Sequence, residues 1–337
     1  MFLALSVVLA DYLYFNPKDQ RLSPYAADEV LGWAPKKDFG RNFPQKDAAG
    51  NRYDAFFSLD HNRFRAYGDT ATSKTKILFL GDSFTGDPFT GNNEMYFSVV
   101  KSTLRQKYHK DVEIFAAGGG GYGTLQEYLF IKEQIKVINP DIFVLQFSDN
   151  DFSNNSLEWE REEIVRNQNF YRPYFSDEKG KLRYSPSRFA GCYRFLYNNS
   201  YFFRRLDIIA QRLQFKYYDG YSRKFSPKEI EKLRGNSYQV TRKVLRLLKQ
   251  EFNKDARLFI IIDETGDKEL NRLQVSVAKE SGFTPLLFPM QNLNALEAKN
   301  KATVLRHADG GHLNILGNRI LGEGLATELF SQMSKKQ

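Results

Sequence analysis

Short apolar runs alternate with longer amphipathic segments along the chain from residue 74 onward. The apolar runs lie at residues 76–80, 112–117, 141–147, 256–263 and 284–289. Each of them has the length of a buried strand. Apolar residues at helical spacing predict helices over residues 94–108, 125–138, 226–252, 267–281 and 314–333. This alternation is typical of βαβ units, so the sequence predicts an α/β fold around a parallel sheet.

Two segments interrupt this pattern. Residues 16–73 are rich in Pro, Asp, Asn and Lys and show no long helical period, so we predict an irregular N-terminal extension. Residues 151–225 carry many Tyr, Phe, Arg and Asn, and we interpret them as an insertion or lid over the sheet. The main domain is then predicted to span residues 74–333, with this insertion inside it.

The N-terminus carries the one candidate targeting segment of the sequence. Residues 2–10, FLALSVVLA, are apolar, but a membrane-spanning helix needs about 20 residues. The run also lacks the basic residues that begin a signal peptide. We interpret residues 1–15 as the remainder of a signal peptide or membrane anchor, with a buried helix or strand as the alternative. The first interpretation predicts an extracytoplasmic protein, periplasmic or attached to a membrane through its N-terminus.

Composition argues against several classes of function. The 337 residues include 49 Lys and Arg against 40 Asp and Glu, a net charge of +9. These basic residues are spread along the chain and form no nucleic-acid-binding motif. The single cysteine, Cys192, permits neither an intrachain disulfide nor a thiolate metal cluster, and the four histidines lack zinc-binding spacing. We therefore expect no metal, no cofactor and no nucleic-acid partner, while the oligomeric state stays open.

Candidate catalytic residues follow the predicted strands, at the edge where parallel α/β sheets bind ligands. Ser83 follows the first strand in the sequence Gly-Asp-Ser, a run of glycines at 118–121 follows the second, and Asn150 follows the third. Asp309 and His312 stand near the end of the chain in the sequence DGGHLN. A serine, exposed backbone N–H groups, an amide and an Asp-x-x-His pair are the groups that acyl transfer requires.

Each of these residues suits one chemical task. An imidazole such as His312 can take the proton of the Ser83 hydroxyl and so make the serine a nucleophile. Asp309 can fix the imidazole tautomer and stabilise the imidazolium. Glycines let backbone N–H groups approach an oxyanion, and the amide of Asn150 can donate a further hydrogen bond. His307 is a rival base, but the spacing from Asp309 favours His312.

Together these residues resemble the SGNH/GDSL hydrolase family. The family's four motifs are matched by Gly81-Asp82-Ser83, by Gly118 and Gly121, by Asn150-Asp151, and by Asp309 and His312. The resemblance implies a flavodoxin-like, three-layer α/β/α sandwich with a central, mainly parallel five-stranded sheet. It also implies catalysis without a cofactor by Ser83, Asp309 and His312, with an oxyanion hole formed by Ser83, Gly121 and Asn150.

Two positions depart from the family pattern. Ala116 stands where the second motif has an asparagine, so a supporting side-chain hydrogen bond is missing there. Asp149 stands where a glycine is common, and an extra carboxylate at this place could narrow the choice of substrate. Neither departure removes a catalytic group. We expect His61 and His109 to be surface or structural residues.

The predicted function is a serine ester hydrolase that removes a small acyl group, such as acetyl, from a glycan or another cell-envelope substrate. The sequences DEVLGW and NRFRAYGD resemble the N-terminal extension of a bacterial subgroup of the family that is often membrane-anchored and linked to cell-surface polymers. Two alternatives stay open at this point. One is an O-acyltransferase that modifies a surface polysaccharide with the same catalytic centre, and the other is a non-catalytic glycan-binding protein.

Overall fold

The computed structural model describes Ser6 and residues 23–86, 88–148, 150–162, 172–175, 182–184, 190–206, 209, 226–262, 267–299 and 304–334. The chain divides into two compact units. The first unit contains residues 1–36 and 153–240, and the second contains residues 37–152 and 241–337. The predicted N-terminal anchor lies, except for Ser6, outside the described residues, and so does much of the predicted lid.

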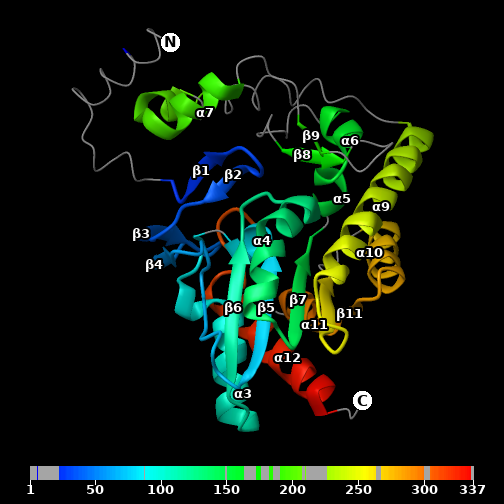
Figure 1. Cartoon of the computed structure of the whole chain (residues 1–337). Helices are drawn as coiled ribbons and strands as arrows, with labels where there is room; N and C mark the ends of the chain where they lie inside the picture. Colours follow the sequence, from blue (N-terminus) through cyan, green and yellow to red (C-terminus); the bar gives the residue numbers. More distant parts are fainter. Residues whose placement is uncertain are drawn as a thin grey trace. The chain divides into compact units, whose positions relative to one another are not determined.

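A five-stranded parallel sheet forms the centre of the second unit (Figure 1). Its strands are β5 (Thr75–Gly81), β6 (Val112–Gly118), β7 (Ile142–Phe147), β10 (Arg257–Ile262) and β11 (Thr284–Leu286). They lie in the order β11-β10-β7-β5-β6, and each neighbouring pair is parallel. The predicted α/β fold is therefore confirmed. Because β6 and β7 pair with opposite edges of β5, the sheet has its topological switch point beside β5, where ligands bind in this class of fold.

One face of the sheet is covered by three helices. These are α3 (Tyr96–Tyr108), α11 (Phe288–Lys299) and α12 (Ile315–Ser334). Ile77 and Phe79 of β5 share one apolar core with buried residues of all three helices. Figure 1 shows α3 and α12 behind the sheet. This layer anchors the C-terminal segment, which carries His312, against the centre of the fold.

The opposite face is covered by α4 (Thr124–Ile138), which packs on β5 in front of the sheet in Figure 1. Leu78 and Leu80 alternate with Ile77 and Phe79 along β5, so they point to this second face, and both are fully buried. A strand that buries both of its faces reads as a continuous apolar run, which is the pattern of the sequence here. The three-layer arrangement predicted for the main domain is confirmed.

The boundaries of the predicted helices agree closely with the structure, but α11 was predicted as part of a strand and the loop after it. The long helices α9 (Pro227–Gln250) and α10 (Lys268–Glu280) lie where the helical spacing placed them. By contrast, the predicted strand 284–289 ends at Leu286, and α11 begins at Phe288. Pro289 lies in the first turn of this helix, where proline is well tolerated because the N–H it lacks has no partner there.

The prediction of an irregular segment before residue 74 is wrong for residues 25–35 and 39–59, each of which forms a pair of antiparallel strands. Strands β3 (Phe39–Lys46) and β4 (Arg52–Leu59) pair as an antiparallel hairpin. Alternate residues of β4, namely Ala55, Phe57 and Leu59, are buried. The chain then reaches β6 through a bridge between Ala66 and Ala116. The hairpin is thus a packed part of the second unit.

The first unit is smaller, and polar side-chain contacts help to hold its elements together. Its described elements are β1 (Tyr25–Asp28), β2 (Gly32–Pro35), α6 (Leu157–Glu162), β8 (Pro173–Phe175), β9 (Leu182–Tyr184) and α7 (Ala190–Asn199), besides the beginning of α9. The amide of Asn198 joins α7 to β1 through both backbone groups of Ala27. The buried side chain of Arg172 lies over the Trp33 ring and pairs with Glu160 at 2.9 Å.

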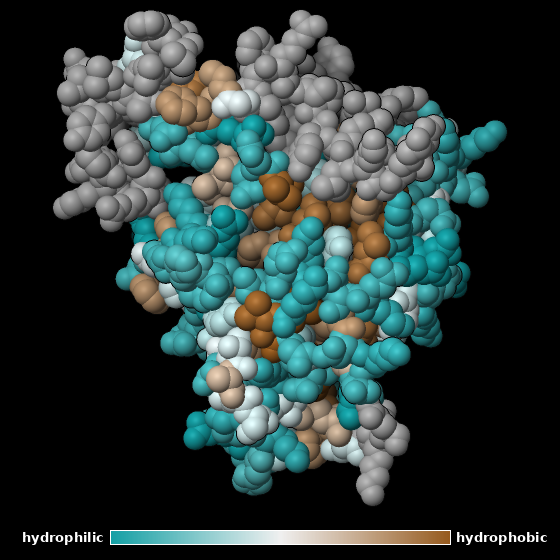
Figure 2. Space-filling model, in the orientation of Figure 1, coloured by the Kyte–Doolittle hydropathy of each residue, from teal (hydrophilic) through white to brown (hydrophobic). Residues whose placement is uncertain are grey.

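The face of the molecule turned toward the viewer is mainly hydrophilic, with small apolar patches between polar ones (Figure 2). Among the residues that the structure describes, no helix is both long enough and apolar enough to cross a bilayer.

Candidate active site

The candidate nucleophile lies at the turn from β5 into the short helix α2 (Ser83–Gly86). Asp82 shapes this turn, because its carboxylate accepts a hydrogen bond from the Phe84 N–H at 3.0 Å and its carbonyl accepts one from the Gly86 N–H at 2.7 Å. A side chain at Gly86 is excluded, since its Cβ would lie 2.4 Å from the carbonyl carbon of Gly118. The turn is therefore pressed against the end of β6, and Ser83 stands on a rigid base.

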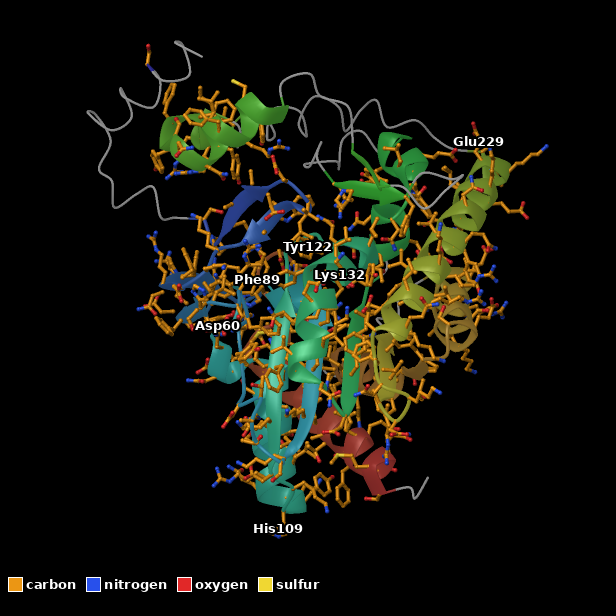
Figure 3. All side chains as sticks on the ribbon, viewed as in Figure 1. Asp60, Phe89, His109, Tyr122, Lys132 and Glu229 are labelled. Carbon is orange, nitrogen blue, oxygen red and sulfur yellow. The ribbon has the colours of Figure 1, made fainter. Side chains whose placement is uncertain are left out.

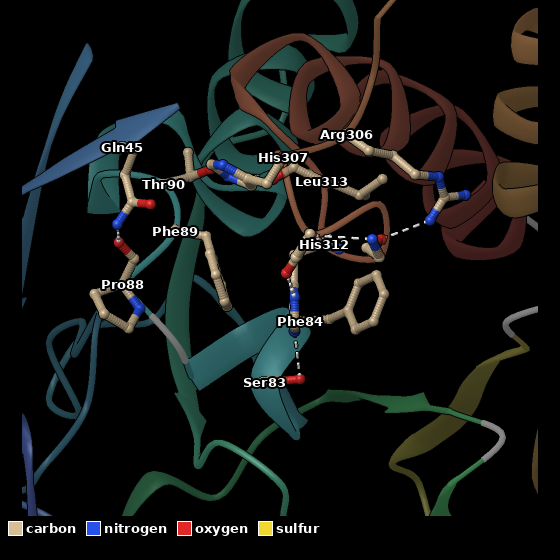
Figure 4. A network of polar contacts seen from close by, with 12 residues as sticks. Gln45, Ser83, Phe84, Pro88, Phe89, Thr90, Arg306, His307, His312 and Leu313 are labelled. Carbon is tan, nitrogen blue, oxygen red and sulfur yellow. Dashed lines mark hydrogen bonds and ion pairs between the residues drawn. The ribbon is translucent and has the colours of Figure 1, made fainter. Parts of the chain in front are cut away.

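Ser83, His312 and Asp309 form a continuous series of hydrogen bonds, and Figure 4 shows the contact between Ser83 and His312. Nε2 of His312 lies 2.8 Å from Oγ of Ser83. Nδ1 of His312 lies 2.5 Å from Oδ2 of Asp309. A proton on Nδ1 is held by the carboxylate, so the lone pair of Nε2 faces the serine hydroxyl. The structure therefore brings together three residues that the sequence analysis proposed from distant positions.

A tight turn holds Asp309 beside His312. Oδ1 of Asp309 accepts hydrogen bonds from the N–H groups of Gly311 at 3.0 Å and His312 at 3.2 Å. The guanidinium of Arg306 donates to the carbonyl of Gly311 at 2.6 Å and pairs with Glu297 of α11 at 3.0 Å. The loop that carries the base is thus fixed both within itself and to the helix layer.

The charge state of Asp309 suits its place in this series. Partial burial raises the pKa of the Asp309 carboxyl, but the hydrogen bonds from His312 and Gly311 and the charge of His312 lower it, so that the net pKa lies below its ordinary value. Asp309 is therefore a carboxylate at neutral pH. Only this form can both accept the Nδ1–H bond and stabilise an imidazolium.

The two other predicted oxyanion residues lie at the same edge of the sheet. β5 lies between β6 and β7, so the residues after these three strands are neighbours. Gly121 follows β6 and has a φ of +67°, a conformation that side chains rarely adopt. Asn150 is the first residue of α5 (Asn150–Asn154), which follows β7. Their roles as oxyanion donors stay predictions.

Three buried carboxyl groups lie close in sequence to the candidate site residues. Asp82 precedes Ser83, Asp151 follows Asn150, and Glu127 lies in the first turn of α4, after Gly121. The carboxylate of Asp151 accepts hydrogen bonds at 2.8 Å from the Thr124 hydroxyl and from the Ser148 N–H. The two carboxyl oxygens of Glu127, in contrast, have no hydrogen-bond partner among the described residues. Burial, followed by the neighbouring carboxyls, raises the pKa of both Glu127 and Asp151 well above the ordinary values.

In the described parts of the chain, no group of three or more His, Cys, Asp or Glu side chains is arranged to hold a metal ion.

The remaining histidines are not part of the hydrogen-bond series of Ser83, His312 and Asp309. His307 is buried, which lowers its pKa, and its ring nitrogens lie 2.9 and 3.0 Å from the hydroxyl of Tyr53. His61 is exposed and pairs with Asp38. Figure 3 shows His109 at the opposite end of the sheet from Tyr122, which follows β6. Ala116 is a buried residue of β6, and Asp149 lies outside the described residues.

Sequence reasoning missed the aromatic residues that flank the candidate base. The ring of Phe89 stacks on the imidazole of His312, with centroids 4.0 Å apart and planes 17° apart. The ring of Phe84 lies 5.1 Å from it at an angle of 37°. A signal for Phe84 was available, because it directly follows the serine. Phe89 lies in a loop without periodicity, and nothing in the sequence pattern singles it out.

Searches against protein-family models and against curated proteins found no match. Among solved structures, the chain is similar to a lipase/acylhydrolase from Enterococcus faecalis at 14% identity and a TM-score of 0.43, covering 78% of this chain and 99% of that one. A psychrotrophic esterase from Pseudoalteromonas sp. gives 9% identity, a TM-score of 0.44 and coverage of 78% and 100%. An acetylxylan esterase from Geobacillus stearothermophilus gives 13% identity and a TM-score of 0.41, with coverage of 80% of this chain and 98% of that one. The structure is thus similar, at low sequence identity, to solved hydrolases of the lipase and esterase type.

Proposed function

We propose that this protein is a serine ester hydrolase of the SGNH/GDSL type, which works through an acyl intermediate on Ser83. The observation that carries the proposal is the hydrogen-bond series from Ser83 through His312 to Asp309, with contacts of 2.8 and 2.5 Å. A serine hydroxyl becomes nucleophilic at neutral pH when such a base is in place. The Gly-Asp-Ser turn at the switch point of the sheet supports the same activity, because substrates bind there.

In the first half of the reaction, Oγ of Ser83 attacks the ester carbonyl while its proton passes to Nε2 of His312. The negative charge moves to the carbonyl oxygen, where the N–H groups of Ser83 and Gly121 and the amide of Asn150 are the proposed donors. The imidazolium then gives its proton to the departing alcohol as the bond between the carbonyl carbon and the alcohol oxygen breaks. The acyl group stays on Ser83.

In the second half, water replaces the alcohol. His312 takes a proton from the water as its oxygen attacks the acyl carbon, and the tetrahedral species is held by the same donors. The proton returns to Oγ of Ser83 as the acyl-oxygen bond breaks, and the carboxylic acid leaves. Asp309 keeps its charge throughout, and it stabilises the imidazolium in both halves.

For the substrate we propose a small acyl ester, such as an acetyl group on a glycan of the cell envelope. The support is the likeness of DEVLGW and NRFRAYGD to the extension of a cell-surface subgroup of the family, together with the apolar run at residues 2–10. An extracytoplasmic location follows from the same two features and is part of this proposal. The chemistry of the site is common to hydrolysis and to transfer, so the products must decide between them.

The test is a screen for acetate release from acetylated glycans and from 4-nitrophenyl acetate, with Ser83→Ala and His312→Ala as controls. We expect release by the wild-type protein and its loss, by about 10³-fold or more, in both variants. Equal turnover by Ser83→Ala would overturn the assignment of the nucleophile. Transfer of acetyl to an added sugar, with little free acetate, would replace the hydrolase by an acyltransferase that uses the same residues.

A further inference from the structure

The ring of Phe89 contacts the rings of two histidines. It stacks on His312, with centroids 4.0 Å apart and planes 17° apart. Its centroid also lies 5.2 Å from that of the His307 ring, at an angle of 47°. Figure 4 shows the ring of Phe89 beside that of His312, with the imidazole of His312 pointing to Ser83. The imidazole of the candidate base is therefore in stacking contact with the ring of Phe89.

Besides Phe89, the hydrogen bonds to Ser83 and Asp309 and the ring of Phe84 restrain the imidazole. The side chains of His312 and Asp309 are 22% and 38% exposed, so water competes for their hydrogen bonds. Proton transfer depends on keeping Nε2 within hydrogen-bond reach of the serine oxygen, and a displacement of about 1 Å can lower the rate about 100-fold. A flat ring in parallel contact limits the rotation of the imidazole about its side-chain bonds.

The loop that carries Phe89 is itself held by the β3–β4 hairpin. The amide of Gln45 in β3 donates to the carbonyl of Pro88 at 2.8 Å. The hydroxyl of Tyr53 in β4 donates to the carbonyl of Phe89 at 3.2 Å. Burial keeps the pKa of His307 below its ordinary value, so its ring is neutral at neutral pH and has one N–H that can donate to the Tyr53 oxygen. Tyr53 can thus accept from His307 while it donates to Phe89.

The same hairpin also forms hydrogen bonds with the segment just before Asp309 and His312. The N–H of Ala48 donates to the carbonyl of Arg306, and the N–H of Ala308 donates to the carbonyl of Lys46, both at 3.0 Å. The turn of the hairpin therefore pairs with residues that directly precede Asp309. The loop of Phe89 and the loop of His312 are therefore both hydrogen-bonded, directly or through the residues just before them, to the β3–β4 hairpin.

We propose that Phe89 is a positioning residue for His312, and that the β3–β4 hairpin is the part of the fold that fixes both. This inference rests on the proposed function, because it assigns Phe89 to the serine-hydrolase centre. It predicts that residues 39–59, although they lie outside the central sheet, control the rate of the chemical step through the Phe89 loop.

The main test compares Phe89→Leu, Phe89→Tyr and Phe330→Leu in the full chain. Phe89→Leu should lower kcat by about 10- to 100-fold and change KM less than about twofold, with both 4-nitrophenyl acetate and 4-nitrophenyl butyrate. Phe89→Tyr keeps the flat ring and should recover most of kcat. Phe330→Leu is the matched control, because it removes a ring stacked on Tyr108 at 4.2 Å and 15° from another part of the same unit. Its kcat should stay at the wild-type value.

A second measurement asks whether Phe89 acts through His312. In a His312→Ala background, the further change Phe89→Leu should alter the slow reaction of Ser83 with a fluorophosphonate by less than about twofold, because the two residues act as a unit. Equal loss in both backgrounds would overturn the inference. A change of KM that grows from acetyl to butyryl would do the same, since it would make Phe89 a substrate contact.

The hairpin is tested by Tyr53→Phe, which removes one hydroxyl and keeps the ring. It should lower kcat by about 3- to 10-fold, the size of one hydrogen bond, and add little to Phe89→Leu. Urea unfolding of each variant shows whether a loss of rate comes from unfolded protein. Failure of this inference is distinct from failure of the proposed function: unchanged labelling rates in Phe89→Leu refute the former, and equal labelling of wild type and Ser83→Ala refutes the latter.

Discussion

Glu127 offers a sharp test of the electrostatics around the site. This residue of α4 is fully buried, and both its carboxyl oxygens lack hydrogen-bond partners among the described residues. Burial, followed by the charges of Asp151 and Asp82, raises the pKa of Glu127 well above its ordinary value. The folded protein therefore keeps a proton on Glu127 at pH values where the unfolded chain has lost it. The change Glu127→Gln replaces this group by a neutral one of the same shape.

The sign and the size of the effect follow from proton linkage. Between the unfolded pKa, about 4.3, and the raised folded pKa, the folded state binds one more proton than the unfolded state. The contribution of Glu127 to the free energy of unfolding of the wild type then falls as pH rises, by about 1.4 kcal/mol per pH unit for this one proton. In Glu127→Gln this contribution is absent. The difference in stability between variant and wild type should therefore grow with pH inside this window.

The assay is urea unfolding of both proteins at half-unit steps from pH 5 to pH 8. Glu133→Gln is the matched control, because Glu133 lies on the same helix and is exposed. We expect Glu133→Gln to follow the wild type and Glu127→Gln to show a flatter dependence on pH. Parallel curves for the wild type and Glu127→Gln would refute the reasoning, since they would mean that Glu127 carries the same charge in both states.

Three further predictions concern the turn, its support and the triad acid. Gly86→Ala places a Cβ 2.4 Å from the carbonyl carbon of Gly118, so it should lower kcat and destabilise the fold by about 2 kcal/mol or more. Gly235→Ala, in the middle of α9 with open space around it, should stabilise the fold by about 0.5–1 kcal/mol. Equal unfolding midpoints of the two variants would contradict both expectations. Arg65→Met removes the guanidinium that donates to the carbonyls of Thr85 and Thr90 and to the amide oxygen of Asn92, and it should lower the free energy of unfolding in urea by about 3 kcal/mol. A decrease below about 1 kcal/mol would show that these acceptors find other partners. Asp309→Asn should lower kcat by about 10³- to 10⁴-fold with little change in unfolding, and wild-type kcat would exclude it as the triad acid.

Much of the fold could be predicted because its central strands bury both faces. The run at residues 76–80 and the helical spacing at 125–138 are local signals of packing, and the structure has β5 and α4 at these places. The candidate triad was also readable, because a parallel sheet brings residues after its strands to one edge. The contact between Ser83 and His312, 229 residues apart in sequence, forms because the loop before α12 also reaches this edge.

Other features could not be predicted because their cause is tertiary. In β3 most residues are exposed, so the hairpin carries an alternating apolar signal in β4 alone, at Ala55, Phe57 and Leu59. The place of Phe89 depends on backbone carbonyls held by Gln45 and Tyr53 from the hairpin, and no local pattern encodes such contacts. The same holds for the start of α11, where a proline in a helical first turn looked like the end of a strand.

The central claim is that Ser83 is a nucleophile activated by His312. The most direct measurement is the mass of the intact protein after reaction with a fluorophosphonate, followed by peptide mapping of the modified residue. We predict one added phosphonyl group on Ser83 in the wild type, none in Ser83→Ala, and a rate at least about 10³-fold lower in His312→Ala. Equal labelling of wild type and Ser83→Ala, or a label on another residue, would contradict the account.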